Sequence, residues 1–294
     1  MQYAGEAFSL GAAAVWAVAV IFFRRAGESN SPFSLNLFRV GVSAFLLLAV
    51  IGISGGSLFE SHVIEDYLWL ALSGIVGIAI SDTMFHKCLN MVGAGINSIV
   101  DCIYSPFVAG LAFLLLGESL SGRQFFGMFL VIGGVVLTTR MVPPEGATHR
   151  DLVIGAMWGV GSMATLALGV IWAKPVLEHS SVLWATTFRQ VASFAAMVPV
   201  ALVAKDRKQI WGIFRPRADW RFTVPGTILG SILALLLWLA GMKYTQAGTA
   251  AVLNQTSTVF ILILAAIFLH EPFTARRWMA AGLALIGIVL VTLG

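Results

Sequence analysis

Polar and ionisable side chains recur at helical spacing inside long apolar stretches of this sequence. Asp82 and His86 are four residues apart, as are Asn97 and Asp101, so each pair shares one face of a helix. Charged groups at membrane depth are costly and are therefore candidates for function. Two carboxylates cannot both ionise cheaply in a low-dielectric site. Such a group could take up and release a proton, or exchange an internal ion pair for the charges of a substrate.

The depth of these side chains depends on where the chain turns between their helices. A turn near Met91 puts Asp82 nine residues before it and Asp101 ten after it, at about the same depth. His86 and Asn97 then form the next layer outward. The sequence therefore predicts one polar layer contributed by two neighbouring helices.

Arg39 lies about seven residues into another apolar run, which enters from the same side. At ~1.5 Å per residue, it could join the carboxylates roughly 9 Å inside the boundary. A structural alternative is equally open, in which Arg39 pairs with a carboxylate or extends to the headgroups. Asp82 and His86 could instead serve as caps or interfacial groups, whereas Asp101 lies deeper and favours a cavity.

The elements that must position these side chains are membrane helices. The chain has 294 residues, of which 59% are hydrophobic and 11% charged, and its mean hydropathy is +0.90. Soluble domains carry about 25% charged residues, so a soluble catalytic domain and most nucleic-acid readers are excluded. With ~20 apolar residues per span, we predict an all-α, multi-pass membrane protein with ten transmembrane helices. The predicted spans are 6–23, 33–53, 67–88, 95–116, 123–141, 152–173, 181–203, 222–241, 248–269 and 278–293.

Lys and Arg side chains are distributed unequally between the predicted loops. The odd-numbered loops carry 13 of them and the opposite face three, while Arg39 and Arg189 lie within spans, which accounts for all 18. The positive-inside rule then places the odd loops in the cytoplasm and both termini outside. The segment from Lys205 to Arg221 contributes most; a cytoplasmic loop explains it, and binding to anionic headgroups is an alternative.

The sequence contains an internal repeat. Shifted by 150 residues, 11–43 aligns without gaps on 161–193 with ten of 33 pairs identical, including Phe38-Arg39 with Phe188-Arg189. Shifted by 153 residues, 77–139 aligns on 230–292. We therefore predict two five-helix repeats, 1–145 and 146–294. Because five is odd, the second copy must be inverted, as in transporters that work by alternating access.

The duplicated motifs resemble the EamA-type members of the drug/metabolite transporter (DMT) superfamily. The resemblance rests on Phe-Arg early in spans 2 and 7, and on Gly117-Glu118-Ser119-Leu120 and His270-Glu271-Pro272-Phe273 before the last helix of each half. It implies export or exchange of small metabolites through a central cavity, often by proton or solute coupling. It also implies cytoplasmic termini, whereas the charge count predicts the reverse.

The second half has a different predicted lining. The repeat aligns Asp101 with Asn254 and Ser105 with Thr258, while Asp82 and His86 align with leucines. The run 254–258 is polar, which suits either cavity lining or interhelical hydrogen bonds. Further candidates for the substrate site are Asn97, Tyr104, Gln255, Trp16 and Trp238; Asp82, His86, Arg39 and Arg189 are candidates for coupling or gating.

The function predicted from these features is that of a secondary transporter in the plasma (inner) membrane. It would export or exchange a small polar or amphipathic metabolite, amino-acid-like or drug-like, with proton coupling as a further hypothesis. Two arginines against two aspartates within spans favour a zwitterion. The alternative is a lipid flippase or scramblase of the same architecture. No catalytic motif, metal-ligand spacing or cofactor motif is found in the sequence, so an enzyme is not expected. The expected partners are a small-molecule metabolite and the lipid bilayer, but no nucleic acid. The expected oligomeric state is a monomer or a homodimer.

Pro106 lies within the fourth predicted span. It cannot donate a hydrogen bond to the carbonyl group of Cys102, four residues earlier. We therefore expect a bent helix with a free acceptor beside Asp101.

Overall fold

A computed structural model describes residues 4–55, 57–59, 63–116, 121–141, 147–244, 253–272 and 274–293. The secondary structure in these ranges is helical, without strands. The first half contains α1 (Ala4–Ala26), α2 (Pro32–Ile53), α3 (Ile64–Gly74), η1 (Ile75–Ile80), α4 (Ser81–Val92), α5 (Ala94–Asp101), α6 (Tyr104–Leu116) and α7 (Gly122–Thr138). The second half contains α8 (His149–His179), α9 (Val182–Val203), α10 (Arg207–Gly212), α11 (Trp220–Ile228), η2 (Leu229–Leu233), α12 (Ala234–Tyr244), α14 (Ser257–Phe268) and α15 (Ala275–Leu293).

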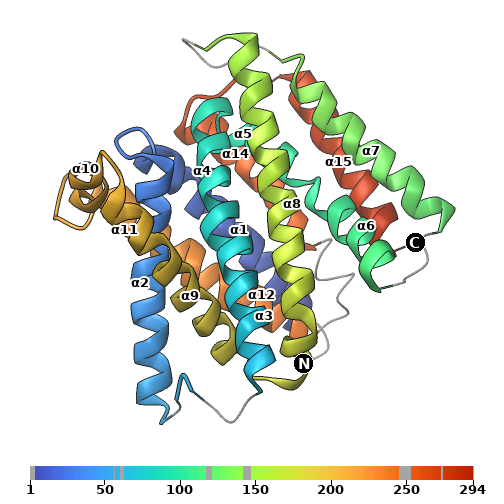
Figure 1. The fold of residues 1–294 in the computed structure, drawn as a ribbon. Helices are drawn as coiled ribbons and strands as arrows, with labels where there is room; N and C mark the ends of the chain where they lie inside the picture. The colour runs from blue at the N-terminus through green and yellow to red at the C-terminus, as the bar shows by residue number, and fades with distance from the viewer. Residues whose placement is uncertain are drawn as a thin grey trace.

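Within the described residues, eight helical segments are long and apolar enough to cross a membrane, so the chain is a multi-pass membrane protein. Two shorter apolar helices, Gly122–Thr138 and Leu253–Phe268, occupy the places of the fifth and ninth predicted spans. Part of the ninth predicted span, 248–252, lies outside the described residues. The long helices run side by side in one bundle (Figure 1).

Two of the spanning segments contain a π-helical stretch. The segment Ile64–Val92 is α-helical except at η1, and the segment that begins at Trp220 has η2 in its middle. The 153-residue repeat offset places Ile75–Ile80 on 228–233, so the two π-helices occupy equivalent positions. Such insertions are rare and frequently lie at functional sites.

The fourth span is interrupted near its middle. α5 ends at Asp101 and α6 begins at Tyr104, with Cys102 and Ile103 in a turn. The interruption lies where Pro106 cannot donate to the carbonyl of Cys102. The expected bend is therefore present, directly after Asp101.

The last helices of the two halves pack antiparallel. A Cβ atom on Gly127 would lie 2.6 Å from the carbonyl oxygen of Gly287, and one on Gly134 would lie 2.7 Å from that of Ala280. The repeat offset makes Gly134 equivalent to Gly287, and Gly127 to Ala280. The contact is therefore reciprocal, as across a two-fold axis. α7 and α15 thus run in opposite directions, as an inverted repeat requires.

The third span packs closely on α8, which belongs to the other half. Ser81 donates to the carbonyl of Ser162 at 2.8 Å, and Ser162 donates to that of Ser81 at 2.8 Å. One turn away, a Cβ on Gly77 would lie 3.2 Å from the Cα of Gly169. Small residues allow this approach, as is typical of membrane helices.

The sequence has two Gly-x-x-x-Gly pairs, Gly155/Gly159 and Gly226/Gly230, and both lie at helix contacts inside the chain. A Cβ atom on Gly159 would lie 2.8 Å from Sγ of Cys88, and one on Gly230 would lie 2.9 Å from the ring of Phe23. Their partners Gly155 and Gly226 face neighbouring helices in the same way. These glycines therefore allow close packing of helices within the bundle.

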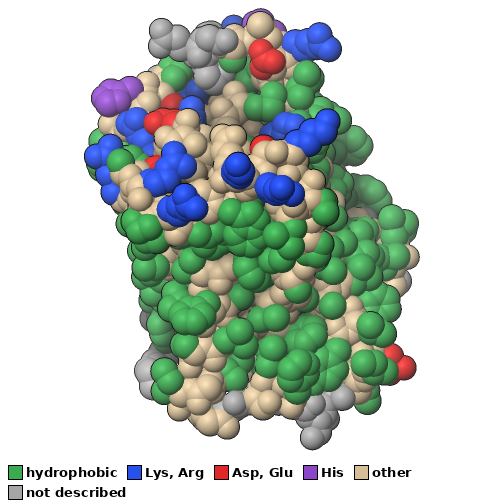
Figure 2. All heavy atoms as spheres, turned by 60° about the vertical axis from the view of Figure 1, so that its left-hand side comes forward, with side chains coloured by type: hydrophobic (Ala, Val, Ile, Leu, Met, Phe, Trp, Pro, Cys, Tyr) green, Lys and Arg blue, Asp and Glu red, His purple; other side chains and the backbone are tan. Residues whose placement is uncertain are grey.

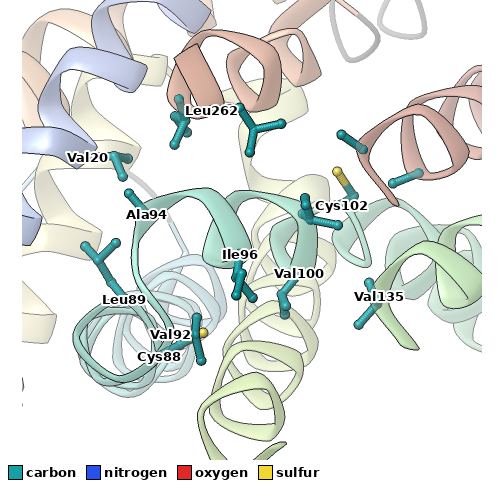
Figure 3. Close-up of a cluster of buried hydrophobic side chains, with 14 of the residues drawn as sticks. Val20, Cys88, Leu89, Val92, Ala94, Ile96, Val100, Cys102, Val135 and Leu262 are labelled. Carbon is teal, nitrogen blue, oxygen red and sulfur yellow. The ribbon is translucent and has the colours of Figure 1, made fainter. Parts of the chain in front are cut away.

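Charged side chains gather at one end of the molecule, above a broad apolar belt (Figure 2). The apolar core surrounds the turn between α4 and α5, where side chains of α1, α7 and α14 converge (Figure 3). Among the large side chains fully buried there are Leu89, Ile96 and Ile99.

Candidate functional site

Arg39 and Asp82 form an ion pair between α2 and α4. The side chains are 6% and 19% exposed, and the Arg39 guanidinium carbon lies 5.7 Å from the centre of the Phe23 ring. The Arg39 Nε is buried and has no acceptor among the described residues. The structure thus gives Arg39 a carboxylate partner and an aromatic neighbour inside the bundle.

His86 lies one helical turn beyond Asp82 and is fully buried. Its ring is 5.1 Å from that of Phe23 and 5.3 Å from that of Phe85. Neither ring nitrogen has a hydrogen-bond partner in the part of the chain that the structure describes. An interfacial or capping role for His86 is therefore wrong, because the side chain is enclosed by aromatic rings.

Asn97 and Asp101 form a second polar pair. The Asn97 amide donates to Oδ2 of Asp101 at 3.0 Å, while Oδ1 of Asp101 is shielded and accepts no hydrogen bond from described residues. Asn97 is fully buried. Within the described ranges, no hydrogen bond or ion pair joins this pair to Arg39, Asp82 or His86.

The single polar layer predicted from the sequence is therefore divided into two groups. The reason is the position of the turn, which is at Gly93, two residues beyond Met91. Gly93 has φ 84°, a left-handed conformation that favours glycine. Counted from Gly93, Asp82 lies eleven residues before the turn and Asp101 eight after it. The difference of three residues between the two carboxylates corresponds to almost one helical turn, about 4.5 Å of depth.

Arg189 on α9 differs from its repeat equivalent Arg39. It has no ion pair among the described residues, and its buried Nε has no acceptor there. A Cβ on Gly77 would lie 3.4 Å from its Nη2, so the guanidinium lies against η1 of the first half. Tyr104 is close enough for its hydroxyl group to interact electrostatically with Arg189. Arg189 is thus a partly buried cation without a bound carboxylate.

The other predicted lining residues have mixed surroundings. Thr258 is buried and donates to the carbonyl of Ser98 at 3.2 Å, so it links α14 to α5. Asn254 and Gln255 are partly buried and make no side-chain hydrogen bond within the described ranges. The remaining predicted residues are partly buried: Ser105, Trp238 and Trp16, the last packed at 5.8 Å from the ring of Phe85.

Glu271 has a role that the sequence did not indicate. Its carboxylate accepts hydrogen bonds from the backbone of Ala94 at 2.6 Å and of Gly95 at 3.1 Å, at the start of α5. It also accepts from Arg277 Nη1 at 2.8 Å. A carboxylate at a helix N-terminus satisfies free N–H groups and the helix dipole. Glu271, from the second half, therefore fixes the helix of the first half that carries Asp101.

The equivalent motif of the first half, 117–120, lies outside the described residues. Glu118 and Glu271 are the glutamates of the two motifs. The presence of a glutamate at the same place in both halves is the sequence signal that could have indicated a structural role for Glu271.

These features define a class of protein: a multi-pass helical membrane protein with ionic groups between its helices. The profile of the EamA-like transporter family matches residues 3–140 and 153–293, once in each half. The chain therefore belongs to the EamA-like transporter family, within the DMT superfamily, and is a membrane transporter, not an enzyme.

Relatives of this chain come from bacteria, plants and animals. The uncharacterised transporter YetK of Bacillus subtilis is 25% identical over 85% of this chain and 74% of its own length. A chloroplastic WAT1-related protein of Arabidopsis thaliana is 22% identical over 94% of this chain and 66% of its own. GDP-fucose transporter 1 of Mus musculus is 22% identical over 70% of this chain and 56% of its own length.

A solved crystal structure supports the fold. It is 15% identical in sequence and superposes with a TM-score of 0.66, over 100% of this chain and 98% of the other. At this identity the similarity concerns the fold alone.

Proposed function

We propose that the chain exports or exchanges a small zwitterionic metabolite, such as an amino acid, with Asp101 binding the ammonium group and Arg189 the carboxylate. The observation that carries this proposal is the difference between the two ionic groups. Arg39 and Asp82 neutralise each other, whereas Asp101 and Arg189 have no ionic partner in the described part of the chain.

The positions of these two side chains support the same substrate class. Asp101 ends α5 in the first half, and Arg189 lies on α9 in the second half. The hydroxyl group of Tyr104, three residues after Asp101, lies within electrostatic range of Arg189. Opposite charges from the two halves can therefore bind the two ends of one molecule. The interruption of the helix after Asp101 also leaves backbone polar groups available, as is common near transporter sites.

Alternating access would then move two inverted repeats, 1–145 and 146–294, around this site. The reciprocal contacts of α7 and α15 support the two-fold relation. In this mechanism the shorter helices Gly122–Thr138 and Leu253–Phe268 complete a set of ten spans. The π-helices η1 and η2, at equivalent positions, would serve as the hinges, because a π-helix has an extra residue that can be redistributed.

Proton coupling would use Asp101. Its Oδ1 accepts no hydrogen bond within the described ranges, so a proton can be held there without breaking the bond from Asn97 to Oδ2. Binding of a substrate ammonium would compete with that proton. The cytoplasmic side of the plasma membrane would be the end that carries α10, because the basic loops gather there.

A binding screen tests the substrate class. Purified protein is heated with amino acids, with monocarboxylates or with primary amines, because a ligand of the folded state raises the melting temperature. Wild-type protein should respond most to amino acids. Asp101→Asn should retain a response to monocarboxylates only, and Arg189→Gln a response to amines only.

Uptake into proteoliposomes then tests transport and coupling. Asp101→Asn should abolish amino-acid exchange and the dependence of uptake on a pH gradient. Asp151→Asn, which changes a partly exposed carboxylate at the start of α8, is the matched control and should transport normally. Wild-type uptake and an unchanged pH dependence in Asp101→Asn would exclude the proposed role.

The alternative function, lipid scrambling, requires a polar groove open to acyl chains. The full burial of His86 and Asn97 between helices favours a solute site instead. Reconstituted protein should therefore not accelerate the flip of a fluorescent phospholipid.

A further inference from the structure

A basic cavity lies at the charged end of the molecule, away from the site described above. Its volume is about 490 Å³, and it is lined by Arg207, Lys208, Trp211 and Arg215. These residues belong to α10 and to the turn after it. The cavity thus combines three cations with an aromatic ring.

α10 is held in place by its apolar face. Ile210 is 3% exposed and packs in an apolar cluster with Leu37 and Val40 of α2 and Met197 of α9. The opposite face, with Arg207 and Lys208, is exposed. The helix therefore presents its cations outward from a fixed position at the ends of α2 and α9.

The charges of this cavity are not neutralised by the protein. Arg207, Lys208 and Arg215 form no ion pair within the described ranges. The indole ring of Trp211 packs against the apolar cluster below α10, and its N–H is shielded from solvent. A ligand rich in acceptor oxygens and carrying negative charge would satisfy the three cations.

The surroundings of the cavity point to a lipid as the source of that charge. Leu202 and Val203, at the end of α9 just before α10, are 54% and 82% exposed. Figure 2 shows the Lys and Arg side chains directly above an apolar belt on the side of the molecule where α10 lies in Figure 1. A headgroup held by the cations would have its acyl chains beside exposed apolar residues.

We propose that this cavity binds the phosphate of an anionic phospholipid. The three cations bind the phosphate oxygens, Trp211 lies at the level of the headgroup, and Leu202 and Val203 contact the first methylene groups. Each cation near an anionic lipid surface contributes about fivefold in affinity. Removing three should therefore weaken binding by about 100-fold.

The experiment compares lipids on the purified full chain in a neutral detergent. Native mass spectrometry and melting temperature are recorded with dioleoyl phosphatidylglycerol, with dioleoyl phosphatidylcholine and with inorganic phosphate at equal concentrations. Wild-type protein should retain phosphatidylglycerol and be stabilised by it more than by the other two. The triple variant Arg207→Gln/Lys208→Gln/Arg215→Gln should lose that preference.

A second triple variant controls for surface charge. Arg140→Gln/Arg150→Gln/Arg276→Gln removes three exposed cations from the other loops of the charged end and should retain the preference. Equal losses in both triple variants would overturn the assigned cavity. Equal stabilisation by inorganic phosphate would indicate a site for free anions, and equal retention of phosphatidylcholine would exclude recognition of charge.

Discussion

Replacing Glu271 by alanine removes three hydrogen bonds to one carboxylate, two from the start of α5 and one from Arg277. It also leaves the Arg277 side chain, which is 6% exposed, without its carboxylate. Loss of one partner of a buried ion pair costs about 3–5 kcal/mol. We therefore expect Glu271→Ala to lower the free energy of unfolding by that amount.

Further variants separate the contribution of the Arg277 ion pair from that of the hydrogen bonds to α5. Arg277→Ala should cost less, about 1–3 kcal/mol, because Glu271 still accepts from Ala94 and Gly95. The double variant should be less destabilised than the sum of the two, since both remove the same bond. Glu28→Ala is the control: its ion pairs are 3.6 and 3.9 Å long and its side chain is 47% exposed, so it should cost under about 1 kcal/mol.

The assay is equilibrium unfolding in mixed micelles, followed by circular dichroism and by the accessibility of a cysteine introduced in place of Ser98 on α5. Cysteine labelling in Glu271→Ala should rise before global unfolding, because α5 has lost its N-terminal fixation. A cost of Glu271→Ala no greater than that of Glu28→Ala would refute the reasoning.

Two further predictions concern Gly93 and Arg39. Gly93→Ala should lower the free energy of unfolding more than Gly55→Ala. Both glycines have positive φ, 84° and 75°, which costs about 1–2 kcal/mol in a non-glycine residue. Only at Gly93 would the new Cβ meet a neighbour, 2.6 Å from Glu271, whereas nothing lies within 4 Å at Gly55. Equal melting temperatures would contradict this. Arg39→Gln should be less stable than the double variant Arg39→Gln/Asp82→Asn, because the single change leaves a buried carboxylate unpaired; a double variant as unstable as the sum of its single changes would show that the pair does not stabilise the fold.

The helices and their general order were predictable from the sequence. Apolar runs of about 20 residues mark membrane spans because backbone groups in lipid must be satisfied within the helix. The bend after Asp101 was predictable as well, because Pro106 lacks an N–H group. The π-helices were not, since they depend on how Ile75–Ile80 and Leu229–Leu233 pack against neighbouring helices.

The grouping of the polar side chains was predicted only in part. Arg39 and Asp82 meet as the spacing allowed, but Asp101 pairs with Asn97 instead of joining them. With the turn at Gly93 instead of Met91, Asp82 lies two residues farther from the turn and Asp101 two residues closer to it. The relative depth of the two carboxylates therefore changes by four residues, about one helical turn.

The sequence alone determined that the chain crosses the membrane many times and contains a duplicated unit, because hydropathy and self-similarity are properties of residue order. Which charges are neutralised was decided only by the tertiary structure. Arg39 and Arg189 are equivalent in the repeat, yet Arg39 forms an ion pair with Asp82, whereas Arg189 lies against Gly77 of η1 and forms no ion pair among the described residues. An ion pair depends on distances of a few ångströms between different helices, and those distances are set by packing and turns that no single stretch of sequence contains.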